Sequence, residues 1–194
     1  MTDLETSAAV ANKIARMAAR AFAEHVLVCK NRDERFSWWL LSKPGTNVYA
    51  SRLFFAPGVI CVYGDVGETI LRVSEREPIG WLLGPTPNEY LLAKVKAASG
   101  EKERFYPGDA RQWCEEMRRD SVDDDRYGRL IHEIDAHDWS EEHDPAYRWL
   151  GLCSDQQPSI DDPPRCQGPT EQMLWLFESL RCFVRLFRAS GFVR

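Results

Sequence analysis

Four short runs of β-favouring residues, joined by tight turns, constrain the fold of this chain more than any other feature. The runs are rich in Val, Ile, Leu and aromatic residues and cover residues 36–41, 48–55, 59–63 and 69–73. Turn-forming residues connect them, namely Lys43-Pro44-Gly45-Thr46-Asn47, Pro57-Gly58 and Gly64-Asp65-Val66-Gly67-Glu68. Because strands joined by short turns run in opposite directions, the sequence predicts a four-stranded antiparallel meander.

Helical patterns flank the predicted strands. Apolar residues recur at steps of three and four over residues 4–25, and helical segments follow Pro78. We expect these later helices at residues 87–98, 109–119, 124–136, 145–151 and 170–190, with an irregular loop at about 153–169. The sequence therefore predicts an α+β fold: an N-terminal helix, the four-stranded antiparallel meander, and a C-terminal set of helices.

The length and composition indicate one globular domain. A chain of 194 residues suits a single domain over 1–194, with a helix-plus-meander core over 1–110 and a helical part over 111–194. No apolar run approaches the roughly 20 residues of a membrane span, and the first residues do not resemble a secretory signal. The six cysteines are scattered without a C-x-x-C pair, which favours reduced thiols in a cytosol. We expect no cofactor, since no phosphate-binding loop motif occurs.

The net charge of −5 is unevenly distributed along the chain. Residues 101–144 hold 15 acidic and 7 basic residues, a balance of −8, whereas the rest of the chain has a balance of +3. Such a segment repels nucleic acid and attracts basic protein surfaces. We therefore expect neither direct nucleic-acid binding nor membrane binding.

Asp65 and Glu68 lie in the turn of residues 64–68, which we call the glycine turn. Two carboxylates between glycines could hold a divalent cation, but hard cations require more oxygen ligands than these two supply. Glycine and aspartate are also the residues that tight hairpins prefer. We therefore favour a structural hairpin turn over a cation site. Among the five residues of the glycine turn, Glu68 is the one that this interpretation explains least.

A second cluster of possible ligands contains three of the four histidines, His132, His137 and His143, among six acidic residues. On one helix the first two would lie about 140° apart and would not share a face. If the helix ended near Ala136, the three imidazoles could meet and bind zinc or another transition metal. A solvated acidic helix end is the alternative interpretation.

Seven tryptophans is a high number for this length. Trp38 and Trp39 are adjacent in a predicted strand, so they must face opposite sides of the sheet. We expect one in the core and the other under a covering helix or in solvent.

The middle of the chain combines four features: the Pro57-Gly58 start of an apolar run, Tyr63 followed by the glycine turn, Gly80-Trp81, and a Tyr90-Leu91-Leu92-Ala93-Lys94 helix. With these features, about residues 50–110 resemble a group of small phage- and prophage-encoded proteins of uncharacterised function. The resemblance brings no catalytic residues. It implies a phage accessory protein that acts in a bacterial cytosol.

The charge asymmetry and the resemblance together predict a non-enzymatic interaction protein that inhibits a host defence system, in the manner of an anti-CRISPR. An acidic surface would compete for a basic nucleic-acid groove on a host defence protein. The expected contact residues are Asp120, Asp123, Asp124, Asp125, Glu133, Asp135, Asp138, Glu141 and Glu142. Two alternatives stay open: a metal-dependent hydrolase or nuclease that uses Asp65 and Glu68 or the three histidines, and a binder of a small nucleotide signal in a pocket roofed by tryptophans.

Overall fold

The computed structural model of the chain describes residues 4–33, 35–74, 76–121, 125–156, 160 and 162–192. It divides into two compact units. The helical unit comprises Met1–Val10 and Glu103–Gly168, and the sheet unit comprises Ala11–Lys102 and Pro169–Arg194. Each unit is built from two separate stretches of the chain.

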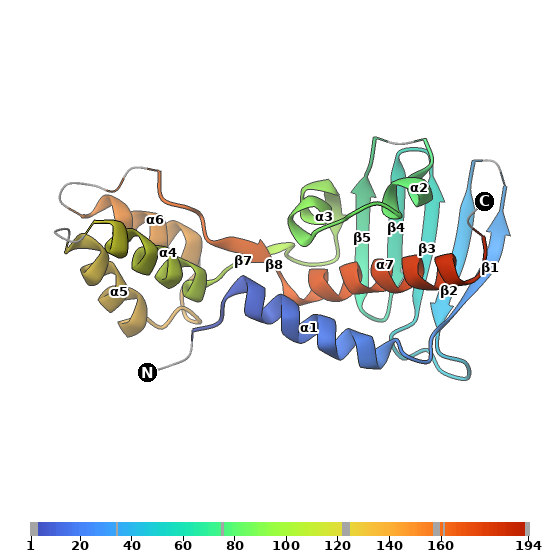
Figure 1. Cartoon of the computed structure of the whole chain (residues 1–194), viewed down its shortest axis with the longest axis horizontal. Coiled ribbons are helices and arrows are strands. Elements are labelled where there is room, and N and C mark those ends of the chain that lie inside the picture. The colour runs from blue at the N-terminus through green and yellow to red at the C-terminus, as the bar shows by residue number, and fades with distance from the viewer. Residues whose placement is uncertain are drawn as a thin grey trace. The chain divides into compact units, whose positions relative to one another are not determined.

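The sheet unit is organised around a six-stranded antiparallel sheet in the order β1-β2-β3-β4-β5-β6 (Figure 1). Its strands are β1 (Val26–Arg32), β2 (Ser37–Ser42), β3 (Ser51–Ala56), β4 (Val59–Gly64), β5 (Gly67–Arg72) and β6 (Val95–Ala98). Its helices are α2 (Pro78–Leu82), α3 (Asn88–Lys94), α7 (Glu171–Ala189) and most of α1 (Ser7–Ala21). All the strands are sequential neighbours, so the sheet is an uninterrupted meander.

One face of the sheet forms the main hydrophobic core. Side chains alternate along each strand, so Trp39, Leu53, Ile60 and Leu71 all point to this face and are fully buried. Helix α7 lies across it (Figure 1) and contributes an apolar stripe that includes Phe177. Helix and sheet therefore bury the same set of side chains.

The opposite face of the sheet carries an aromatic row across three strands. The rings of Trp38 and Phe54 are stacked with centroids 5.7 Å apart, and those of Phe54 and Tyr63 are stacked at 5.8 Å. The guanidinium of Arg52 lies 5.2 Å from the centroid of Tyr63, within the range of a cation–π interaction. The prediction that Trp38 and Trp39 face opposite sides is confirmed.

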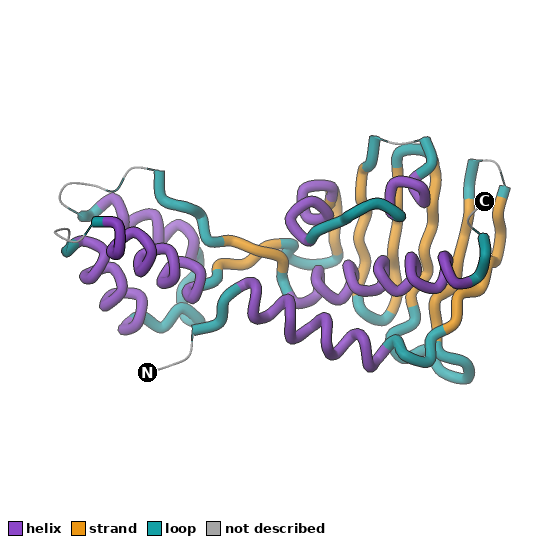
Figure 2. Tube along the Cα trace, in the orientation of Figure 1, coloured by secondary structure: helices purple, strands orange, loops and turns teal. Residues whose placement is uncertain are grey.

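The helical unit packs three helices around a second core (Figure 2). These are α4 (Pro107–Asp120), α5 (Arg126–Ala136) and α6 (Pro145–Ser154), and the short strands β7 (Glu103–Phe105) and β8 (Gln167–Pro169) pair beside them. Cys114, Leu130 and Trp149 are fully buried in this core. The indole N–H of Trp149 donates to the carbonyl of Pro164 at 2.7 Å, so the one polar atom of that side chain is satisfied.

The predicted α+β class is confirmed, and the four predicted strands correspond to β2, β3, β4 and β5. The sheet is larger than predicted because β1 and β6 add one strand at each edge. The prediction of a helix through residues 95–98 is wrong, since these residues pair with β5. Pairing with an existing strand has overridden the helical propensity of Lys96, Ala97 and Ala98.

Other predicted boundaries also move. The first helix ends at Ala21 rather than near residue 25, and the buried imidazole of His25 packs edge-on against Phe22 at 5.0 Å. Residues 153–169 are not one loop, since α6 continues through Ser154 and β8 begins at Gln167. The division between the two units falls at residue 102 rather than near 110, and the expectation of one domain over 1–194 stays a prediction.

No helix in the described part of the chain is long and apolar enough to cross a membrane.

The glycine turn shows why its residue types are required. A Cβ atom at Gly64 would collide with the backbone carbonyl oxygen of Ala50, which cannot move away as a flexible side chain could. Gly67 has a φ of +121°, a conformation that side-chain-bearing residues rarely adopt. A Cβ there would also collide with the side chain of Gln172 at the start of α7.

Replacing Gly64 with alanine should lower the free energy of unfolding of the sheet unit by about 3 kcal/mol or more, because the new methyl group displaces backbone. Urea denaturation followed by tryptophan fluorescence measures this change. Gly80→Ala is the matched control, since the nearest atom to its new Cβ is 3.9 Å away and the position is helical. The control should be neutral or stabilising by up to about 1 kcal/mol. Equal losses in the two variants would contradict this account of the turn.

Candidate functional site

Asp65 of the glycine turn is engaged in local structure. Its Oδ2 accepts a hydrogen bond from the backbone N–H of Tyr49 at 2.9 Å, and its own N–H donates to the carbonyl of Ala50 at 3.0 Å. Tyr49 has a φ of +56°, which is uncommon for a residue other than glycine. The Asp65 carboxylate thus ties the β4–β5 turn to the unusual backbone between β2 and β3.

Glu68 lies apart from this arrangement. It pairs with Tyr63 across the β4–β5 ladder, so its side chain is on the aromatic face of the sheet, where it is exposed. Its backbone N–H donates to the hydroxyl of Ser99 at 3.0 Å, and that hydroxyl also accepts from Gln172 at 3.2 Å. The backbone of Glu68 helps to hold the turn against α7, whereas its carboxylate forms no ion pair or hydrogen bond with another described residue.

The three histidines are not brought together as metal ligands. His132 is exposed on α5, and His143 is exposed in the segment before α6. His137 follows the end of α5, with a ring nitrogen 3.2 Å from Glu142 Oε2 and its ring 4.6 Å from that of Trp139. Among the residues that the structure describes, no three His, Cys, Asp or Glu side chains group as a metal site would require, at the histidines or at the glycine turn.

The nine predicted contact acids differ in how they are engaged. Asp123 and Asp124 lie outside the described residues. Asp125 pairs with Arg129 at 3.3 Å, and Glu142 lies against His137 as described above. Asp138 accepts hydrogen bonds from Ser140, which lower its carboxyl pKa.

Asp135 is the most firmly engaged of the nine. Its carboxylate accepts a hydrogen bond from Arg111 Nε at 2.9 Å, and Arg111 also pairs with Glu115. The bond to Asp135 is the largest of the effects that raise the pKa of the Arg111 guanidinium. This pair links α4 to α5 and is an internal contact rather than a docking group.

Three of the predicted residues are exposed and form neither an ion pair nor a side-chain hydrogen bond with another described residue: Asp120, Glu133 and Glu141. Asp120 is the last residue of α4, and Glu133 lies on the exposed side of α5. Glu141 is in the segment between α5 and α6. Within the described part of the chain, these three carboxylates are the predicted contact residues that are not engaged by a neighbouring side chain, and the contact surface itself stays a prediction.

The fold separates charge more completely than the linear sequence does. The stretches that make up the helical unit contain 19 acidic and 8 basic residues, a net charge of −11. Those of the sheet unit contain 11 acidic and 17 basic residues, a net charge of +6. Counting only residues 101–144 underestimates the difference in net charge between the two units. The helical unit also contains acidic residues near the N-terminus, as well as Asp155, Asp161 and Asp162.

The thiols of the helical unit are poor nucleophiles. Burial raises the pKa of Cys114, Cys153 and Cys166 to about 12. Since the thiolate is the reactive form, these side chains are protonated at neutral pH. Their place in the second core indicates a packing role.

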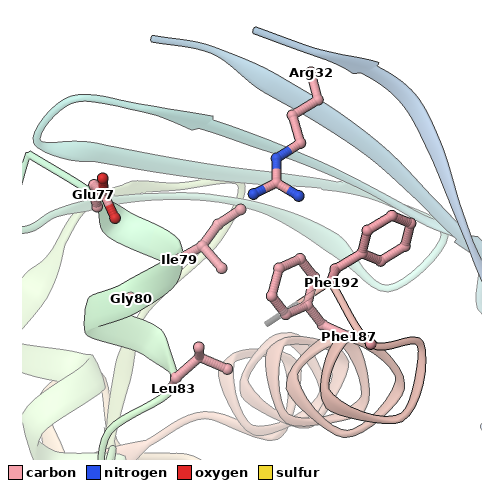
Figure 3. A pocket seen from close by; sticks show the side chains of 8 residues that line it. Arg32, Glu77, Ile79, Gly80, Leu83, Phe187 and Phe192 are labelled. Atoms are coloured by element: carbon pink, nitrogen blue, oxygen red, sulfur yellow. The ribbon is translucent and has the colours of Figure 1, made fainter. Parts of the chain in front are cut away.

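The sheet unit contains a cavity that the sequence did not reveal. It has a volume of about 700 Å³ and lies between the end of β1, helix α2 and the end of α7 (Figure 3). Arg32 extends into it from β1, with Ile79 and Leu83 on one side and Phe187 and Phe192 on the other. Residues far apart in the sequence form this site, so no local motif could have predicted it.

Comparison of the chain with protein-family models, with curated proteins and with solved structures gives no match. The resemblance of residues 50–110 to phage-encoded proteins therefore stays a prediction.

The two carboxylates of the glycine turn can be separated by mutation. Asp65→Ala removes the acceptor for the Tyr49 N–H and should lower the free energy of unfolding by about 1 kcal/mol. Glu68→Ala should change it by less than about 0.5 kcal/mol, as expected for an exposed side chain away from structural contacts. Urea denaturation of both variants gives the comparison. Equal effects, or a larger one at Glu68, would disprove the structural role of Asp65.

The buried thiols predict a loss of stability at alkaline pH. Their pKa values are higher in the folded chain than the ordinary value of about 8.5, so folding keeps them protonated. The stabilisation is complete below the unfolded pKa and is lost as the pH rises from there towards the folded pKa of about 12. Denaturation at a series of pH values should show this fall, and Cys114→Ala should make it shallower. An unchanged pH slope in that variant would refute the assignment.

Proposed function

We propose that this protein is a non-enzymatic interaction protein whose acidic helical unit binds a basic surface on a partner protein. The observation that carries the proposal is the division of charge, −11 on the helical unit and +6 on the sheet unit. Charge of one sign gathered on one compact unit gives that unit a field that reaches beyond its individual side chains. The sheet unit of the same chain carries net charge of the opposite sign.

Electrostatics of this kind acts mainly on the rate and specificity of association. At physiological ionic strength exposed charges are screened over about 8 Å, so the field guides a partner only at close approach. Complementary potentials speed the encounter and disfavour partners with acidic surfaces. Binding should therefore weaken as salt is raised.

The acids that can face a partner are those without internal pairs. Asp120, Glu133 and Glu141 are exposed and form neither an ion pair nor a side-chain hydrogen bond with another described residue, whereas Asp135 is bound to Arg111 and Asp138 to Ser140. Acids already paired within the chain contribute less, because a partner would have to displace their existing contacts. Glu133 and Glu141 are therefore the best positions at which to test the surface.

The narrower form of the proposal is that the partner is a host defence protein with a basic nucleic-acid groove, as a phage-encoded anti-CRISPR would bind. Its support is the acidic unit together with the resemblance of residues 50–110. The acidic unit would occupy the groove and exclude nucleic acid by charge competition. A gel-shift assay with a purified CRISPR effector complex tests this form directly, since the protein should release the bound DNA.

The broader proposal is tested with the double variant Glu133→Gln/Glu141→Gln. Immobilised wild-type protein should capture a basic protein from bacterial lysate, and the captured amount should fall with added salt. The double variant should capture less, because two exposed charges are lost without disturbing an internal pair. Quantification of the captured band at several salt concentrations provides the measurement.

The matched control is Glu89→Gln/Glu101→Gln, which removes two exposed acids from the sheet unit. Both double variants change the total charge equally, so only the location of the lost charge differs. Capture by the control should match that of the wild type. If the two double variants behaved alike, the helical unit would not be the contact surface.

A further inference from the structure

The cavity in the sheet unit has the size and lining of a small-molecule site. Its volume of about 700 Å³ falls in the range of about 300–1,000 Å³ that is usual for ligand pockets. The apolar walls come from α2 and from the end of α7, as Figure 3 shows. A smaller adjoining cavity of about 250 Å³ shares Arg32, Glu77 and Ile79 with it.

Arg32 is the basic group of the cavity. It projects from the end of β1 towards the space between Ile79 and Phe187 (Figure 3), and its guanidinium lies 5.9 Å from the centroid of the Phe187 ring. It forms no ion pair with another described residue. A guanidinium presents a planar set of donors that matches a carboxylate or a phosphate.

The surrounding charges favour an anion near Arg32. Arg35 and Arg76 line the adjoining cavity, and Arg188 donates to the carbonyl of Leu83 beneath α2. The Asp33 carboxylate is already engaged, because it accepts the backbone N–H groups of Arg35 and Phe36 at 2.8 and 2.7 Å. Those two bonds lower its pKa.

The walls favour a flat, apolar body on the ligand. The rings of Phe187 and Phe192 are stacked with centroids 5.8 Å apart, and Phe192 is also in edge contact with Trp39 at 5.2 Å. Ile79 and Leu83 form the opposite wall, and Glu77 lies on the α2 side of the cavity (Figure 3). Its carboxylate can accept hydrogen bonds from N–H groups of a ring.

We propose that this cavity binds a small planar organic anion. The anionic group, a carboxylate or a phosphate, pairs with Arg32, the ring lies between the Ile79 and Phe187 walls, and N–H groups of the ring or of its amino substituent face Glu77. A purine nucleotide and an amino-substituted aromatic acid share this chemistry. The site lies wholly within the sheet unit and is independent of the acidic surface of the helical unit.

The test is an NMR titration of the full-length, nitrogen-15-labelled protein. The backbone amides of Gly80 and Gly191, which both line the cavity, serve as reporters. The probes are GMP, 4-aminobenzoate and inorganic phosphate at matched ionic strength. Saturable shifts with either ring-bearing anion, but not with phosphate alone, are expected, and the probe that binds identifies the anionic group. No saturable shift with GMP or 4-aminobenzoate, or an equal response to phosphate, would overturn the proposal.

Substitutions then assign the roles of the lining residues. Arg32→Gln should weaken binding by at least about tenfold, because it removes a charge-assisted hydrogen bond. Phe192→Ala removes an exposed part of the wall and should also weaken binding. Arg16→Gln, an exposed arginine on α1, is the control and should bind as the wild type does. Preserved spectra establish that each variant is folded, and unchanged affinity in Arg32→Gln would rule out the assignment.

Discussion

The packing of α7 against the buried face of the sheet is the contact on which the sheet unit depends. The meander alone would expose Trp39, Leu53, Ile60 and Leu71, which are all fully buried in the complete unit. Helix α7 covers them with a stripe of large apolar residues, of which Phe177 and Phe183 are fully buried. Burial of each such side chain contributes about 1.5–3 kcal/mol, so this one interface outweighs any single turn or ion pair in the unit.

The glycine turn also depends on the position of α7, since Gly67 and Ser99 both lie against Gln172 at the start of that helix.

The central part of the sheet could be predicted from the sequence because local signals and burial agree there. In β2 to β5 the alternating side chains and the glycine- and proline-containing turns all indicate the same antiparallel arrangement. The edge strands lack this agreement. Most residues of β1 are exposed, so few of its side chains point into the core and its alternation is weak. Strand β6 consists of Val95, Lys96, Ala97 and Ala98, a sequence that locally favours a helix. Their strand conformation comes from pairing with a neighbour that is distant in the sequence.

The candidate sites were predictable only where they depend on composition. The acidic character of the C-terminal half was evident, but its confinement to one unit required the fold, because that unit joins Met1–Val10 to Glu103–Gly168. Asp135 was included in the predicted contact surface because sequence alone does not show that Arg111 lies across from it. The cavity at Arg32 was missed for the same reason, since β1, α2 and the end of α7 meet only in three dimensions.

The chain returns to the sheet unit after residue 168. The helical unit is therefore largely an insertion in the sheet unit. The chain leaves the sheet unit at Lys102 and re-enters it at Pro169, and the backbone N–H of Thr170 donates to the carbonyl of Lys102 at 3.1 Å. The two ends of the interruption are therefore already neighbours within the sheet unit. Such closely spaced ends are what insertions between exposed positions of a host domain require. The acidic helical unit can thus change in sequence or length while the six-stranded sheet that carries it stays the same.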